Sequence, residues 1–215
     1  MKVVSVNVGM PREVEWNGKT VSTGIYKSPV STPIDLKKLN LAGDGQADLT
    51  VHGGVNMAVY VYSTGHYDYW KTQLPDVELE WGAFGENLSV EGCLDHEVYI
   101  GDCFRIGTAQ VQVTQPRAPC FKLGIRFGDQ GMVKRFMDSR RFGFYLRVLK
   151  EGVVQAGDEM ELVEQDKGKV SVSDIMSLYL NPSDRELMQR AVNVESLAES
   201  WQEHFLETLA KGESK

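Results

Sequence analysis

The amino-acid sequence predicts a mainly β protein: an antiparallel β-barrel with a few flanking helices, followed by a small C-terminal α-helical bundle. The first 165 residues contain many short runs in which apolar and polar residues alternate, and glycine turns separate these runs. Many short strands at this spacing are typical of a barrel rather than of a doubly wound sheet. The last 50 residues instead repeat apolar residues at helical intervals. We therefore expect a barrel domain at 1–165 and a three-helix domain at 166–215, joined by a polar linker at 165–169.

The first expected strand contains Val4, Val6 and Val8, which alternate with Ser5 and Asn7 in the period-2 pattern of a half-buried strand. Further strands are expected at 24–27, 58–62, 97–100, 104–106, 109–114 and 158–163. Two helices, at 66–74 and 129–139, are expected beside the barrel.

Three short helices are expected after the linker. The first begins at Ser171 and ends before Asn181-Pro182, because proline cannot continue a helix. The segment from Ser183 to Glu186 reads as a capping box that opens the second helix. The third begins near residue 195 and carries an apolar stripe made of Leu197, Trp201, Phe205 and Leu209. If Trp201 and Phe205 faced outward, the bundle would be a protein-interaction module.

Charge is distributed unevenly along the chain. The net charge is −7, but the window 117–150 holds nine basic residues and two acidic ones, so it carries +7 and the remainder carries −14. A confined basic region in an acidic protein favours a small anionic ligand, and no nucleic-acid partner is expected. The alternative is a solvated basic helix face, which applies above all to Lys134, Arg135, Arg140 and Arg141.

Three cysteines, Cys93, Cys103 and Cys120, are odd in number and form no CxxC pair, which indicates reduced thiols in a cytoplasmic protein. The N-terminal run is too short and too alternating for a signal peptide. The sequence has no run of about 18 apolar residues, so no membrane-spanning segment is expected.

The most informative segment is 115–122, which places Cys120 between a proline and Phe121, with Arg117 and Lys122 close in sequence. Nearby positive charge favours the thiolate, the form that attacks electrophiles and binds metals. The alternative is a buried structural cysteine, a common role for a lone free thiol.

Three other residues or motifs are candidate ligand contacts. His52-Gly53-Gly54 can present backbone amides to an anion or a flat ring, although a loop histidine beside a tight turn fits the same pattern. Asn87 can bind a ligand through its carboxamide or stabilise its own turn. Arg147 lies in an apolar strand pattern and needs an acidic residue or an anionic ligand as partner.

Other features exclude common alternatives. Asp44 and Asp48 are expected to hold their own loop rather than act as acid and base. The sequence has no GxGxxG, Walker A, GxSxG or HExxH motif, and the spacing of its four histidines disfavours a zinc hydrolase.

Taken together, the motifs resemble a MOSC domain, the family related to the C-terminal domain of molybdenum-cofactor sulfurases. The ordered segments 52–54, 85–88, 101–102, 115–120 and 145–158 carry the resemblance, which extends over essentially the whole chain. The last 50 residues resemble the three-helix extension of the bacterial YiiM subgroup. One departure is Met57, where a basic residue would be expected.

The resemblance implies a barrel pocket that holds a molybdenum cofactor (molybdopterin), with Cys120 as the catalytic thiolate and metal ligand. It implies that Lys27, Arg117 and the 52–54 loop bind the cofactor, and Asn87 and Arg147 join them as expected cofactor contacts. The purified protein can lack the cofactor and hold phosphate or another anion instead. The implied reaction is reduction of N-hydroxylated small molecules such as hydroxylamino purine analogues, with an external electron-donor reductase. A non-catalytic carrier or sulfur-transfer module remains open, as does a monomer or a homodimer.

Overall fold

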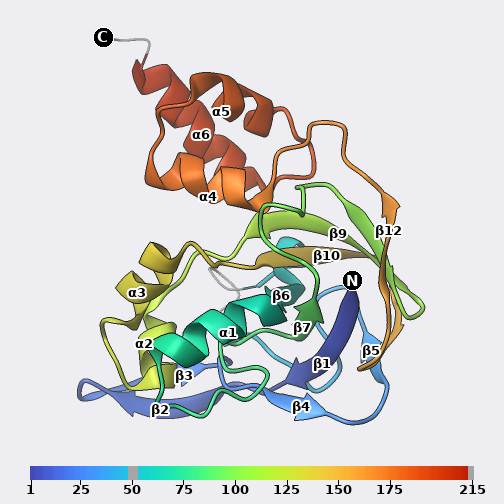
Figure 1. The fold of residues 1–215 in the computed structure, drawn as a ribbon, viewed down its shortest axis with the longest axis vertical. Helices are drawn as coiled ribbons and strands as arrows, with labels where there is room; N and C mark the ends of the chain where they lie inside the picture. The colour runs from blue at the N-terminus through green and yellow to red at the C-terminus, as the bar shows by residue number, and fades with distance from the viewer. Residues whose placement is uncertain (48–52, 213–215) are drawn as a thin grey trace.

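The computed structural model describes residues 1–47 and 53–212, and its fold is built around an eight-stranded mixed sheet in the order β12-β8-β9-β10-β6-β7-β1-β4 (Figure 1). β6 and β7 pair in parallel, and the other neighbours pair antiparallel. The strands are β1 Lys2–Val8, β4 Ser28–Val30, β6 Val59–Ser63, β7 Leu88–Glu91, β8 Cys103–Ile106, β9 Ala109–Pro116, β10 Phe144–Lys150 and β12 Met160–Glu164.

Two small sheets and four helical segments surround this sheet. The hairpin β2 Arg12–Trp16 and β3 Lys19–Thr23 forms one small sheet, and β5 Ile34–Leu36 pairs with β11 Gly152–Val154 in the other. The helical segments are η1 Val55–Met57, α1 Thr64–Gln73, α2 Phe121–Phe127 and α3 Met132–Ser139.

The mainly β prediction is confirmed, but the described strands form no closed ladder. β12 and β4 are the two edges of the sheet. Three backbone hydrogen bonds still join the start of β1 to the segment entering β12: Val3 N to Asp158 O (2.9 Å), Gly157 N to Val3 O (2.8 Å) and Met160 N to Met1 O (3.0 Å). The sheet therefore curls back on itself without full closure.

Two expected strands are wrong. Residues 24–27 and 97–100 are not strands, because neither segment has a neighbouring ladder to join. Within the described part of the chain, the second segment forms one isolated bridge, between Tyr99 and Ser171 at the start of the C-terminal helices. The helices expected at 66–74 and 129–139 are present as α1 and α3, whereas α2 was not expected.

The three C-terminal helices lie above the sheet in Figure 1 and are α4 Val172–Leu180, α5 Arg185–Val192 and α6 Glu199–Gly212. The capping box lies at Ser171 and Asp174 on α4, while α5 is capped by Asp184 rather than Ser183, because the Asp184 carboxylate accepts from Leu187 N. We keep the division at 165/166 as a proposal.

The apolar stripe of α6 faces the interior. Trp201 is 8 % exposed and Phe205 is fully buried, so the partner-facing role considered for these two side chains is wrong. No helix among the described residues has both the length and the apolar character needed to cross a membrane.

Candidate functional site

One pocket opens among segments that are far apart in the sequence. Its walls come from the loop before β4, the loop after β5, the start of β6, the turn before β7, the segment between β9 and α2, and β10. Cys120, Arg117, Lys27 and Asn87 all line it. The structure therefore brings together four of the residues expected at a cofactor site.

The remaining expected site residues are placed differently. His52 lies outside the described residues. Gly53 and Gly54 are described, and Gly54 begins η1 with a φ of 86°, but neither lines the pocket. Arg147 also lies elsewhere.

Cys120 occupies the N-cap position of α2 and lines the pocket in a half-buried environment. Burial raises the pKa of Cys93, which lies in the core, and burial with nearby Glu164 raises the pKa of Cys103. Neither of these two thiols lines the pocket, so Cys120 is the candidate metal ligand among the three.

Arg117 supplies buried positive charge beside Cys120. Its guanidinium carbon lies 5.4 Å from the centre of the Tyr60 ring and 5.1 Å from that of the Phe136 ring. Burial disfavours the charged form of Arg117, but the nearby side chains of Tyr60, Tyr145 and Cys120 favour it more strongly. The pKa of Arg117 is therefore raised. Its Nη1 atom is buried with no hydrogen-bond partner among the described residues. Because buried charged donors are normally paired, this atom is a candidate contact for an anionic ligand.

The backbone of Arg117 is held from behind by a buried turn. Its N–H donates to the carbonyl of Gly143 at 3.1 Å. The Asp95 carboxylate in turn accepts from the N–H groups of Phe142 (2.7 Å) and Gly143 (3.2 Å), and it lies 3.0 Å from His66 Nε2. The position of Arg117 therefore depends on the conformation of Gly143.

Replacing Gly143 with alanine should destabilise the protein and displace Arg117. Gly143 has a φ of 68°, and a Cβ atom there would lie 2.3 Å from the Val61 carbonyl oxygen. Left-handed backbone strain costs about 1–3 kcal/mol, and overpacking adds roughly as much. Gly157→Ala is the matched control, because Gly157 has a φ of 95° but no atom within 4 Å of the added Cβ. Urea denaturation should show the larger loss for Gly143→Ala, and equal losses would contradict this account.

Asp44 organises the opposite wall of the pocket. Its Oδ1 accepts from Lys27 Nζ (2.5 Å) and Gly9 N (2.9 Å), and its Oδ2 accepts from Asn87 Nδ2 (2.8 Å). Asp44 and Lys27 are 1 % and 8 % exposed, and burial lowers the pKa of Lys27 against the opposing effect of Asp44. Asp44 thus connects distant segments instead of holding only its own loop, which corrects the sequence-based expectation.

This network changes the roles of Lys27 and Asn87. Lys27 reaches the pocket as one half of an ion pair, not as a free cation. Asn87 also uses its Oδ1 to accept from Tyr60 N at 3.0 Å, so its carboxamide binds the protein on both sides. Both residues shape the wall, and Asn87 fits the turn-stabilising alternative as well as the ligand-binding one.

Replacing Asp44 with asparagine should lower the free energy of unfolding by about 3 kcal/mol, because it leaves the buried Lys27 ammonium without its counter-charge. Adding Lys27→Met should recover most of this loss, since the buried charge is then removed as well. Urea denaturation of the two single variants and the double variant tests the coupling. Additive losses in the double variant would contradict it.

Arg147 is directed to the C-terminal helices. Its Nη2 donates to the carbonyl of Ser196 at 2.9 Å, and it does not line the pocket. Burial lowers its pKa against the opposing effect of Cys103. Its partner is thus a backbone carbonyl, which is neither the acidic residue nor the anion that the sequence suggested.

Two tyrosines complete the pocket and were not predicted as site residues. In the sequence they appear only as aromatic residues within strand patterns. Tyr60 and Tyr145 line the pocket with ring centres 5.3 Å apart. Burial raises the pKa of both phenols, so both stay protonated. The Tyr60 hydroxyl donates to the carbonyl of Phe142 at 2.8 Å, so Tyr145 is the one of the two that can donate to a ligand. Met57 also lines the pocket, so a thioether stands where the family resemblance suggested a cation. Among the described residues, the charged lining comprises Lys27, Arg117 and Lys122 against Asp44, and this part of the lining is positive.

Comparison with known proteins agrees with this arrangement. A "MOSC domain" family model matches residues 48–161, and a "YiiM-like, 3-alpha helix domain" model matches residues 170–212. The chain is 41 % identical over 205 residues to the uncharacterized protein YflK of Bacillus subtilis (95 % of this chain, 92 % of that one). It is 36 % identical over 182 residues to the protein YiiM of Escherichia coli (83 % and 81 %).

Two further similarities extend the comparison. A protein of Gibberella moniliformis named "Reductase" is 34 % identical over 188 residues, which are 86 % of this chain but 32 % of the fungal protein. The crystal structure of YiiM from Geobacillus stearothermophilus superimposes with a TM-score of 0.82 at 32 % identity, covering 97 % of this chain and 98 % of that one. The chain therefore belongs to the MOSC domain family and carries the three-helix domain of YiiM-like proteins.

Proposed function

We propose that this protein is a molybdenum-dependent reductase of N-hydroxylated compounds, such as hydroxylamino purine analogues. The observation that carries the proposal is the pairing, in one pocket, of the Cys120 thiol with the buried and unpaired Nη1 of Arg117. A soft thiolate suits molybdenum, and a fixed guanidinium suits the phosphate of a pterin cofactor.

The pocket residues fit a molybdopterin-type cofactor. Cys120 would be its protein thiolate ligand, and Arg117 would bind an anionic group of the cofactor. Lys122 adds a second cation at the start of α2, and the protonated phenol of Tyr145 adds a donor. Among the described residues, Gly53, Gly54 and Arg147 do not line the pocket.

The reaction breaks an N–O bond. An N-hydroxylated substrate takes up two electrons and two protons, and it yields the corresponding amine or amidine together with water. When bound, the cofactor supplies the two-electron redox chemistry. The pocket supplies orientation through the rings of Tyr60 and Tyr145 and through the fixed charge of Arg117. The electrons must come from a separate donor, which we propose is a reductase in the cytoplasm. The name "Reductase" of the fungal relative supports a redox role for the part of that protein that is similar to this chain.

Turnover measurements test the proposal directly. Protein made in a host that synthesises the cofactor should reduce 6-hydroxylaminopurine to adenine with reduced methyl viologen as the electron source. Product formation is followed by chromatography, and protein from a host unable to make the cofactor is the control. Equal rates for the two preparations would rule the proposal out.

A carrier or sulfur-transfer role is the second candidate. The half-buried Cys120 thiol favours it, because a persulfide there could still be reached from solution. This role predicts cofactor or sulfur release to a partner with no reduction of 6-hydroxylaminopurine.

A further inference from the structure

We propose that the basic surface of α2 and α3 is the docking surface for an acidic electron-transfer protein. This proposal rests on the proposed reductase function, which requires a separate electron donor. We call this surface the α2–α3 face and define it by the exposed Lys134 and Arg140 and the half-buried Lys122, Arg126, Arg135 and Arg141, of which Arg126 and Arg141 lie over the rings of Tyr26 and Tyr69.

The α2–α3 face keeps most of its positive charge. Its six basic residues stand against two acidic ones, Asp129 and Asp138, which leaves a net charge of +4. Lys134 pairs with Asp138 (2.6 Å) and Arg135 with Asp129 (3.2 Å), and both pairs are exposed. The other four form no ion pair with an acidic side chain among the described residues. Exposed pairs are weak and cancel little of the field.

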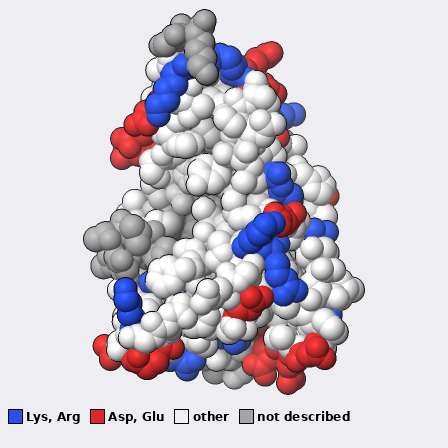
Figure 2. All heavy atoms as spheres, turned by 90° about the vertical axis from the view of Figure 1, so that its left-hand side faces the viewer, with Lys and Arg blue, Asp and Glu red and all other residues white. Residues whose placement is uncertain are grey.

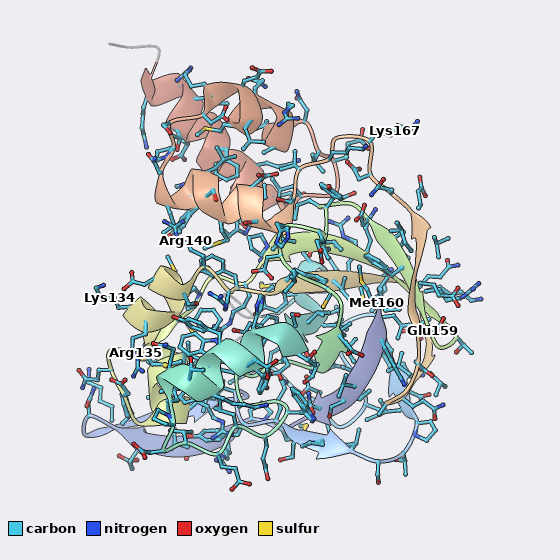
Figure 3. All side chains as sticks on the ribbon, in the orientation of Figure 1. Lys134, Arg135, Arg140, Glu159, Met160 and Lys167 are labelled. Carbon is cyan, nitrogen blue, oxygen red and sulfur yellow. The ribbon has the colours of Figure 1, made fainter. Side chains whose placement is uncertain are left out.

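Lys134 and Arg135 on α3 and Arg140 at its C-cap project from the same side of the molecule in Figure 3, and Lys167 lies across from them. Figure 2 looks onto the side where α3 lies and shows a group of basic side chains at mid-height. Because the whole chain carries −7, an acidic protein is repelled by most of the surface and attracted here.

The α2–α3 face also lies close to the pocket. Phe136, on the buried side of α3, packs 5.1 Å from the guanidinium carbon of Arg117, and Lys134 and Arg135 precede it directly in sequence. A helix is only about 10 Å wide, so a partner docked on α3 is separated from Arg117 by one helix. Lys122 extends the face to the pocket lining, and Cys120 caps α2. A donor held here can pass electrons to the pocket without entering it.

Charge variants with a matched control test this proposal. Lys134→Glu with Arg140→Asn lowers the net charge of the face by three, and Lys211→Glu with Lys169→Asn lowers the net charge by three elsewhere. Each double variant breaks one exposed i,i+4 ion pair: Lys134 with Asp138 in the face variant, and Lys211 with Glu207 in the control variant. Both also place asparagine at a left-handed residue (φ 56° at Arg140, φ 48° at Lys169), which asparagine tolerates.

The probe is a bacterial flavodoxin, a small acidic redox protein, titrated against the full-length protein at low and high salt. The face variant should bind about tenfold more weakly at low salt, with a shallower salt dependence, and the control variant should bind like the wild type. Turnover with reduced flavodoxin should fall in parallel for the face variant, while turnover with reduced methyl viologen stays unchanged.

The two proposals fail in different ways. Lack of viologen-driven turnover overturns the reductase function, whatever flavodoxin does. Viologen-driven turnover without flavodoxin binding, or with equal binding by both double variants, overturns the docking surface. Tighter binding of duplex DNA or anionic vesicles through the same residues would also overturn it, because the partner would then not be an acidic protein.

Discussion

The Cys120→Ala variant should lose its molybdenum. Cys120 is the one cysteine that lines the pocket, and a metal held by a single protein thiolate depends on that ligand. Removing even the supporting partners of a metal ligand lowers metal affinity 10- to 100-fold, so we expect a loss of at least about a hundredfold. Metal analysis of protein isolated from a cofactor-producing host measures it, and reduction of 6-hydroxylaminopurine should disappear with the metal.

Cys103→Ala is the matched control for this variant. Cys103 is also half-buried, but it lies on β8 outside the pocket lining. This variant should keep both molybdenum and activity. Equal molybdenum in the wild type and Cys120→Ala would show that the thiolate is not the metal ligand.

Arg117→Met should lower anion affinity without lowering stability. The variant removes a buried guanidinium whose Nη1 has no described partner, and methionine fills much of the same apolar space between Tyr60 and Phe136. A hydrogen bond to a charged group is worth about 1.5–3 kcal/mol, so affinity for inorganic phosphate should fall roughly 10- to 150-fold. The variant loses the favourable contacts of Arg117 with Tyr60 and Tyr145, but it also removes a buried donor, Nη1, that has no described partner, so without phosphate it should unfold near the wild-type temperature. Calorimetric titration and thermal unfolding measure the two effects.

Arg147→Met separates the role of the half-buried Arg147 from that of the buried Arg117. Arg147 also has a buried unpaired atom, Nε, but its Nη2 bonds the Ser196 carbonyl beside the C-terminal helices. Its loss should leave phosphate affinity unchanged and lower stability by about 1 kcal/mol, the value of one hydrogen bond. If Arg147→Met weakened phosphate binding as much as Arg117→Met, the assignment of the anion site to the pocket would be wrong.

Much of the fold followed from local patterns. The alternating run at 4–8 is part of β1, and the runs at 58–62, 104–106, 109–114 and 158–163 correspond to β6, β8, β9 and β12. The run at 24–27 has a similar pattern, but it lies along the pocket. Gly9 packs against this run so closely that a Cβ atom added to Gly9 would lie 2.0 Å from the Tyr26 carbonyl oxygen. Periodicity shows that a segment can form a strand, but a strand also needs a neighbour with free backbone groups.

The candidate site was only partly visible in the sequence. Cys120 and Arg117 share one short segment, so their proximity followed from spacing. Asp44 gave no such signal, because its partners Gly9, Lys27 and Asn87 lie 35, 17 and 43 residues away. In a sequence, an acidic residue that stabilises its own glycine-rich loop cannot be told from one that forms an ion pair with a distant lysine.

The sequence by itself determined the strand and helix periods, the capped C-terminal helices, the charge asymmetry and the thiol of Cys120. Only the tertiary structure decided which of the cations serves the pocket. Arg117 lies beside Cys120 with an unpaired atom, Lys27 is paired with Asp44, and Arg147 faces the C-terminal helices. The physical reason is that a sequence pattern shows which charged groups the chain contains. The role of a buried charge instead depends on the groups that lie within a few ångströms of it in the folded protein.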